Sequence, residues 1–90
     1  MVREKLNPLS GNEGETALGK ELILFNDEVN SFDFVIETLI DTCDHDQFQA
    51  EQCATIAHFK GKCSVKSGSF DELKPPHDEM SRRGLTVSIE

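Results

Sequence analysis

The 90-residue sequence contains no tryptophan and no tyrosine, so its six phenylalanines are its only large aromatic side chains. It also lacks a long hydrophobic run, because no stretch approaches the roughly 18 apolar residues that a membrane-spanning helix requires. The first residues, MVREK, lead into polar sequence, so no signal peptide is expected. A chain of this length forms one small domain, in which a surface groove is easier to build than a deep, enclosed active site.

Basic residues are scarce as well. The chain carries 9 lysines and arginines against 17 acidic residues, for a formal net charge of −8 at pH 7. Phosphate binding depends on neutralisation by lysine and arginine, so this balance argues against nucleic acid as the main partner, and it also argues against anionic membrane surfaces. An acidic surface instead favours partners that carry positive charge, including the free α-amino group of a peptide.

The three cysteines, Cys43, Cys53 and Cys63, are an odd number without tight spacing, which is a poor disulfide framework. Their spacing matches no zinc pattern, and no metal or cofactor is expected. His45 lies between two aspartates, but the side chains of adjacent residues point in different directions and rarely form a site alone. We therefore expect reduced, partly buried thiols in a cytoplasmic protein.

Hydrophobic patterning divides the chain into a polar N-terminal tail, residues 1–17, and one domain, residues 18–90. Apolar runs and alternation predict strands, and apolar residues that recur every three or four positions predict helices. The predicted order is a strand (22–25), a helix (32–43), a helix (47–59), a weak strand (63–66), a helix from the capping box at Ser69 toward Arg83, and a strand (85–89). Only Pro75 and Pro76 conflict with regular first turns of the last helix.

The most economical architecture for this order is an α+β fold. It consists of a small three-stranded, largely antiparallel sheet with three helices packed on one face.

Three polar residues are the main candidates for binding chemistry. Asn26 and Asp27 follow the first predicted strand, and His58 lies late in the second predicted helix. Asparagine offers an acceptor and a donor, ionised aspartate offers acceptors only, and histidine offers either. Together they could surround a primary ammonium group and the first peptide unit of a ligand. Locally, however, the first two residues also fit an ordinary strand-to-loop turn, and the third fits a structural or exposed histidine.

Phe32 and the small side chains of Ala54 and Ala57 suggest a cavity for a bulky side chain, although simple core packing explains the same row. A small enzyme that uses Cys53 or His58 is a further interpretation. It is not favoured, because residues five apart are poorly aligned on a helix.

Several segments together resemble the ClpS family, the adaptor of the Clp protease that delivers N-end-rule substrates. These segments are residues 24–28 (LFNDE), 34–36 (FVI), 57–62 (AHFKGK) and 85–90 (LTVSIE). The similarity covers roughly residues 20–90 in the right order and spacing. Each motif is modest, and it is their combination that is specific.

The resemblance implies that Asn26, Asp27 and His58 bind the α-amino group and first peptide bond of a substrate. It implies a hydrophobic pocket for the first side chain (Phe, Tyr, Trp or Leu), lined by Asn30, Phe32, Val35, Ala54, Ala57 and Leu85. It further implies a non-enzymatic monomer that delivers proteins to a Clp AAA+ ATPase–ClpP protease. The partner would be the N-terminal domain of a ClpA-type or ClpC-type ATPase, engaged by the N-terminal tail.

Two positions depart from the family pattern, because many relatives have methionine at the positions of Phe32 and Ala54. Phenylalanine is bulkier and stiffer than methionine, whereas alanine removes volume, so the pocket is expected to be reshaped. An alternative keeps the fold and discards the pocket. In that case the domain docks on a Clp ATPase without recognising peptide ends, and Phe32 and Leu85 fill the cavity.

Overall fold

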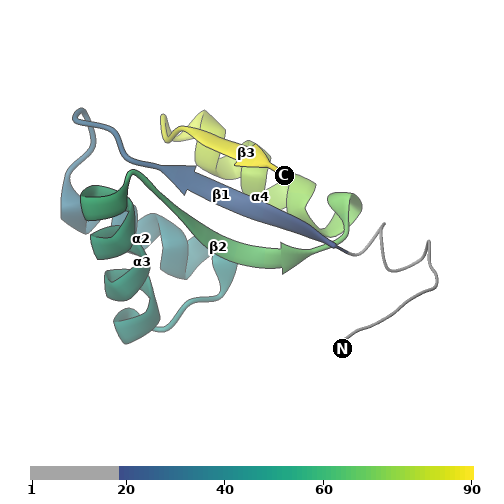
Figure 1. The fold of residues 1–90 in the computed structure, drawn as a ribbon, viewed down its shortest axis with the longest axis horizontal. Coiled ribbons are helices and arrows are strands. Elements are labelled where there is room, and N and C mark those ends of the chain that lie inside the picture. The colour runs from purple at the N-terminus through teal and green to yellow at the C-terminus, as the bar shows by residue number, and fades with distance from the viewer. Residues whose placement is uncertain (1–18) are drawn as a thin grey trace.

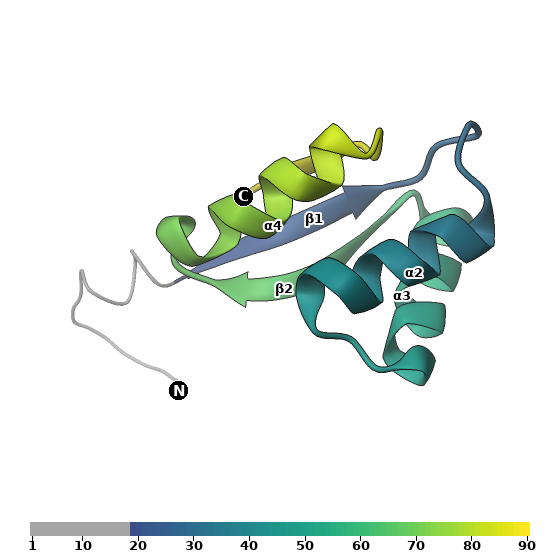
Figure 2. The ribbon, with the colours of Figure 1, turned by 180° about the vertical axis from the view of Figure 1, so that it is seen from behind.

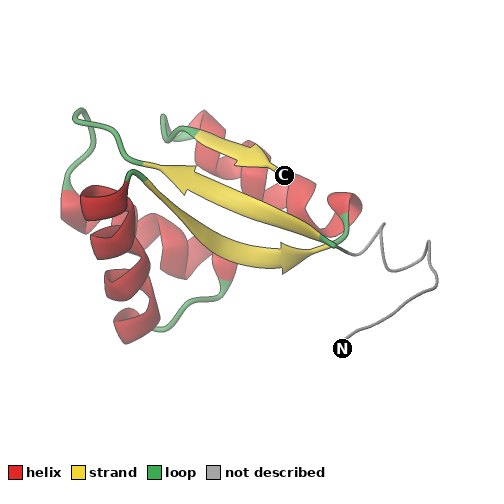
Figure 3. Ribbon diagram, viewed as in Figure 1, coloured by secondary structure: helices red, strands yellow, loops and turns green. Residues whose placement is uncertain are grey.

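The computed structural model describes residues 19–90, so the predicted tail, residues 1–17, lies outside the described residues. Over the described part, strands and helices follow the predicted order (Figure 1, Figure 3). The elements are β1 (Lys20–Phe25), α2 (Phe32–Cys43), α3 (Gln47–Lys60), β2 (Lys62–Gly68), α4 (Phe70–Arg82) and β3 (Val87–Ile89). None of the helices in residues 19–90 is long and apolar enough to cross a membrane.

The sheet has the strand order β2-β1-β3, and β1 pairs antiparallel with both neighbours. The view from behind places α2 and α4 over one face of the sheet (Figure 2). Helix α3 packs against α2 and β2 at the end of the sheet where β1 finishes (Figure 1). The predicted α+β class, with three helices and a three-stranded antiparallel sheet, is therefore confirmed.

Strand β1 is the centre of the sheet and carries the longest buried apolar run. Leu22, Ile23 and Leu24 are all buried, as expected for a strand with a neighbour on either side. The run stops at Phe25, and the chain leaves the sheet at Asn26. The polar loop that follows β1 therefore begins at the edge of the core.

Helix α2 begins after Ser31, whose hydroxyl oxygen accepts a hydrogen bond from the backbone N–H of Phe34 at 3.1 Å. Its buried face includes Ile36, Leu39 and Cys43, which are positions of the predicted apolar periodicity. The helix therefore starts immediately beyond the loop 26–31 and is anchored in the core by its apolar face.

Helix α3 buries a face made only of small side chains, Ala50, Ala54 and Ala57, so it can approach α2 and β2 closely. It ends at Gly61, whose φ of 96° is the left-handed conformation typical of glycine at a helix end. The larger side chain of Phe59 is left 78% exposed beyond this face.

Helix α4 opens with the predicted capping box, in which Ser69 and Glu72 exchange side-chain and backbone hydrogen bonds. Pro75 and Pro76 lie inside the helix, which continues through them to Arg82. Each proline lacks an N–H, so each removes one helical hydrogen bond. The apolar anchors on either side, Leu73 and Met80, are fully buried and hold the helix in place.

The last strand is shorter than predicted, because β3 begins at Val87 and not at Leu85. The Leu85 N–H donates to the Met80 carbonyl at 3.1 Å, so this residue closes the end of α4 and does not extend the strand. Its side chain, 4% exposed, packs into the core. The alternating apolar pattern of the segment therefore predicts that Leu85 is buried, but it does not reveal that the backbone of Leu85 bonds to α4 and not to β1.

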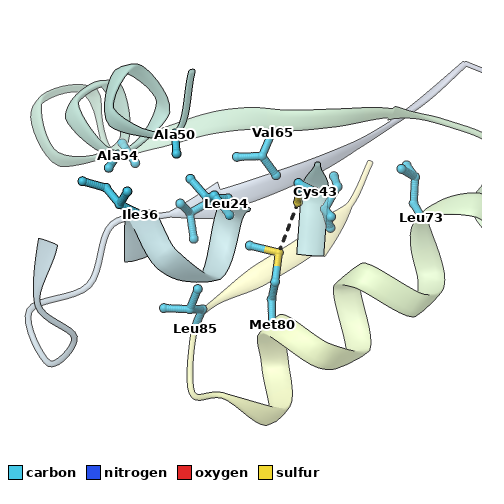
Figure 4. Close-up of a cluster of buried hydrophobic side chains, with 12 residues drawn as sticks. Leu24, Ile36, Cys43, Ala50, Ala54, Val65, Leu73, Met80 and Leu85 are labelled. Carbon is cyan, nitrogen blue, oxygen red and sulfur yellow. Dashed lines mark hydrogen bonds between the residues drawn. The ribbon is translucent and has the colours of Figure 1, made fainter. Parts of the chain in front are cut away.

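The main core lies between the sheet and the helices and joins every element except the short β3, which contributes partly buried residues (Figure 4). Leu24 and Val65 come from the sheet, and Ile36, Ala54 and Met80 come from the three helices. The cysteine at the end of α2, Cys43, lies 3.8 Å from the Met80 sulfur within this core. The core therefore fixes β1, α2 and α3 relative to one another, and these are the elements that surround the site described below.

Candidate functional site

A cavity of about 430 Å³ opens where the end of β1, the loop 26–31, the start of α2 and the second half of α3 meet. Every site residue predicted from the sequence lines it, with the exception of Leu85. The lining residues are Leu24, Phe25, Asn26, Asp27, Glu28, Asn30, Phe32, Val35, Ala54, Ala57 and His58. Residues from two separate segments of the chain, 24–35 and 54–58, therefore converge on one recess.

Leu85 was predicted to line the pocket, but its side chain belongs to the core. The segment still contacts the site through its backbone, because the Asn30 side-chain N–H₂ donates to the Gly84 carbonyl at 3.1 Å. This bond ties the loop after β1 to the turn after α4. A backbone contact of this kind carries no residue signature, and the place of Leu85 in the lining was implied only by the family resemblance.

Three lining residues were not among the predicted site residues: Leu24, Phe25 and Glu28. They adjoin Asn26 and Asp27 in the sequence and belong with them to the segment 24–28 of the family resemblance. Leu24 is almost completely buried and serves the core and the cavity wall together. Glu28 is exposed and adds a second carboxylate beside the recess.

The Asp27 carboxylate organises the loop on which it lies. Its Oδ1 accepts hydrogen bonds from the backbone N–H groups of Val29 (2.9 Å) and Asn30 (2.8 Å), and its Oδ2 accepts one from the Asn30 side-chain N–H₂ (3.1 Å). Partial burial raises the pKa of Asp27, but the hydrogen bonds from Asn30 and Val29 outweigh it, so this pKa lies below its ordinary value of 3.8. The carboxylate is therefore negatively charged at neutral pH.

The lowered pKa of Asp27 also links the loop to pH. The ionised carboxylate stabilises the folded loop above the unfolded pKa, and this contribution is lost as the pH falls through the folded pKa. At neutral pH the loop is therefore held in its folded arrangement by the charged form of Asp27.

The hydrogen bonds within the loop leave acceptor capacity toward the cavity. Each carboxylate oxygen has about two lone-pair sites, and Asp27 Oδ2 uses one of them for Asn30. The Asn30 side-chain amide donates both to Asp27 and to Gly84, so its N–H groups are engaged within the protein. Its remaining polar group is the amide oxygen, an acceptor. The loop therefore offers oxygen acceptors beside a fixed negative charge.

Asn26 follows β1 and His58 lies near the end of α3, and a backbone hydrogen bond holds these two segments together. The Asn26 N–H donates to the Gly61 carbonyl at 2.9 Å, which fixes the start of the loop against the end of α3. Within residues 19–90, neither the Asn26 side chain nor the His58 imidazole has a hydrogen-bond partner, and both residues are exposed. The His58 ring packs edge-to-face on Phe59 at a centroid distance of 4.9 Å. With respect to residues 19–90, both polar side chains therefore retain their hydrogen-bonding capacity for a ligand.

The opposite part of the cavity is apolar. Ala54 and Ala57 are each 4% exposed and form part of its inner wall, with Val35 beside them. Phe32 lines the cavity and is 46% exposed, and Leu85 is in the core. Neither residue fills the space, contrary to what the docking-only alternative predicted. The recess consequently combines a polar, negatively charged rim with an apolar interior.

The catalytic alternative finds little chemical support. Burial, together with the neighbouring Cys63 thiol, raises the pKa of Cys53 to about 12, so this thiol is protonated at neutral pH and a weak nucleophile. His45 is buried and its Nε2 lies 2.7 Å from the Val65 carbonyl oxygen, which is a structural role. In the described part of the chain, no group of three or more metal-ligating side chains gathers.

The fold and the recess together define a small α+β domain with one polar-rimmed, apolar binding cavity. Residues 20–88 match the family described as ATP-dependent Clp protease adaptor protein ClpS. The chain belongs to the ClpS family.

A solved structure of ClpS2 from Agrobacterium tumefaciens, bound to L-phenylalaninamide, has the same fold with a TM-score of 0.70. It is 20% identical in sequence, and the match covers 82% of this chain and 96% of that one. A search of curated protein sequences finds no match.

Proposed function

We propose that this chain binds the free N-terminus of protein substrates that begin with a bulky hydrophobic residue and delivers them to a Clp AAA+ ATPase–ClpP protease. The observation that carries the proposal is a single recess that combines the Asp27 carboxylate, Asn26 and His58 with an apolar interior. A peptide end with a large first side chain has the complementary features, a positive charge next to an apolar group.

The polar rim is suited to the α-amino group. A free α-amino group has a pKa near ~8 and is mostly charged at neutral pH. Asp27 supplies the opposite charge, and the oxygens of Asn26 and Asn30 supply further acceptors within the same recess. His58 is proposed to hydrogen-bond the first peptide unit, because its imidazole can donate or accept.

The apolar part is suited to a large first side chain such as that of Phe, Tyr, Trp or Leu. Phe32, Val35, Ala54 and Ala57 supply the contacts, and the cavity volume of about 430 Å³ leaves room for an aromatic ring. Burying such a side chain contributes about 1.5–3 kcal/mol. Most of the selectivity is therefore expected to come from apolar burial, and the requirement for a free terminus from the polar rim.

Membership of the ClpS adaptor family supports the delivery step. The partner proposed is the N-terminal domain of a ClpA-type or ClpC-type ATPase in the cytoplasm, with the chain acting as a monomer. The adaptor itself catalyses no reaction in this scheme. The residues 1–17 are proposed to engage the ATPase.

Fluorescence anisotropy with a labelled peptide tests the binding step. A peptide that begins with Phe is expected to bind, and the same peptide acetylated at its N-terminus is expected to bind at least about 30-fold more weakly, since acetylation removes the charge that pairs with Asp27. A third peptide that begins with Ser separates the contribution of the first side chain. Equal affinity for the free and acetylated peptides, or binding of neither, would refute the proposal.

A further inference from the structure

Two cysteine thiols from different elements approach the same backbone carbonyl group. Cys53 lies in α3 and Cys63 in β2, and both sulfurs approach the Ser64 carbonyl oxygen, at 3.9 Å and 3.5 Å. Both residues are half-buried. The third cysteine, Cys43, is buried in the core beside Met80.

The environment of this pair disfavours a catalytic role but favours pairing. Burial first, and then the contact with Cys63, raise the pKa of Cys53 to about 12, so this thiol stays protonated at neutral pH. A buried, protonated thiol reacts slowly with diffusing reagents, whereas a neighbouring sulfur is within reach without diffusion. A disulfide between the two cysteines would therefore form by a first reaction at Cys63, followed by attack from Cys53.

We infer that Cys53 and Cys63 form a reversible disulfide that fastens α3 to β2, through exchange with a low-molecular-weight disulfide such as oxidised glutathione. The Cys63 thiolate attacks one glutathione sulfur, the glutathione disulfide bond breaks, and one glutathione thiolate leaves. The Cys53 thiol then loses its proton and attacks the Cys63 sulfur of the mixed disulfide, which releases the second glutathione. The two cysteines lose two electrons and two protons, and glutathione disulfide gains them as two thiols.

The crosslink would close a short loop that carries part of the cavity. Cys53 and Cys63 are ten residues apart in the sequence, and Ala54, Ala57 and His58 lie between them. Because both sulfurs lie beside the same Ser64 carbonyl oxygen, at 3.9 Å and 3.5 Å, the bond is expected to form with little movement of α3. The inference extends beyond adaptor function, and its test involves no peptide, so failure of peptide binding would leave it unaffected.

The experiment equilibrates the full chain with oxidised and reduced glutathione, traps free thiols by alkylation, and locates the linkage by peptide mass spectrometry. The expected result is one alkylated cysteine, Cys43, and a Cys53–Cys63 crosslinked peptide that disappears on reduction. The urea midpoint of unfolding is expected to rise by about 1 M in the oxidised form, because the crosslink restricts the unfolded chain.

Variants make the outcome specific. Cys43→Ala is expected to close as the wild type does, whereas Cys53→Ser and Cys63→Ser are each expected to stop at a single glutathione adduct or at free thiols. Three alkylated cysteines in the wild type, a stable single adduct, a linkage to Cys43 or a crosslink between two chains would each overturn the inference. Mass spectrometry of the wild-type chain identifies the linked cysteines by itself, so the test remains valid even if a variant fails to fold.

Discussion

Asp27→Asn is expected to weaken the binding of a peptide with a free N-terminal Phe by about 30-fold or more, which corresponds to about 2 kcal/mol. The substitution removes the negative charge that pairs with the α-amino group. The asparagine side-chain oxygen can still accept the hydrogen bonds that Asp27 Oδ1 accepts from Val29 and Asn30, whereas the bond that Oδ2 accepts from the Asn30 side chain is lost. Isothermal titration calorimetry at neutral pH measures the change.

The matched control is Glu37→Gln, which removes the same unit of charge from an exposed position on α2 outside the cavity. Its affinity for the peptide is expected to stay within about twofold of the wild type, because exposed charges at a distance are screened by salt. An Asp27→Asn variant that is folded by circular dichroism and binds as tightly as Glu37→Gln would show that the carboxylate does not hold the ligand.

Raising the pH from 7 to 9.5 is expected to weaken binding by about 30-fold, because the α-amino group of the peptide, with a pKa near ~8, loses its proton over this range. Contact with a carboxylate favours the charged amine, so the affinity is complete below the pKa of the free amine and declines above it. The lowered pKa of Asp27 keeps this carboxylate ionised throughout, so the ligand accounts for the change. Anisotropy titrations at half-unit intervals of pH give the profile.

Circular dichroism across the same pH series is the control for the fold. Cys53, with its pKa raised to about 12, stays protonated over the whole range and leaves the wall of the cavity unchanged. An affinity independent of pH in a folded protein would mean that an uncharged feature of the peptide is recognised, and the role given to Asp27 would be wrong.

Much of the fold could be predicted because local patterns and tertiary packing agree. The apolar periodicity of α2 and the capping box of α4 specify their elements directly. The sequence was less informative where tertiary contacts decide. Pro75 and Pro76 are tolerated inside α4 because buried residues on both sides anchor that helix, and Leu85 turns into the core because its backbone closes the end of the same helix.

The candidate site illustrates a different limit. The local explanation of Asn26 and Asp27 as a strand-to-loop turn is correct, and yet the same residues line the cavity with His58. An ordinary turn and a binding loop therefore share one sequence signature. The loop becomes part of a binding cavity only because α3 packs beside it. The hydrogen bond from the Asn30 side chain to the Gly84 carbonyl had no signal in the sequence, because it joins residues from distant segments.

The cysteines show the same dependence on topology. A spacing of ten residues has no meaning along the chain by itself. It brings Cys53 and Cys63 together because α3 ends at Gly61 and the chain turns directly back into β2, which packs against that helix.

The central claim is that one recess holds a charged chain terminus beside an apolar cavity, and a two-dimensional ¹H–¹⁵N NMR titration tests it residue by residue. With L-phenylalaninamide, the largest shifts are expected at residues 26–32 and 54–58, and N-acetyl-L-phenylalaninamide is expected to leave these signals in place. Shifts confined to other surfaces of the sheet or helices, or equal shifts with the acetylated compound, would contradict the account.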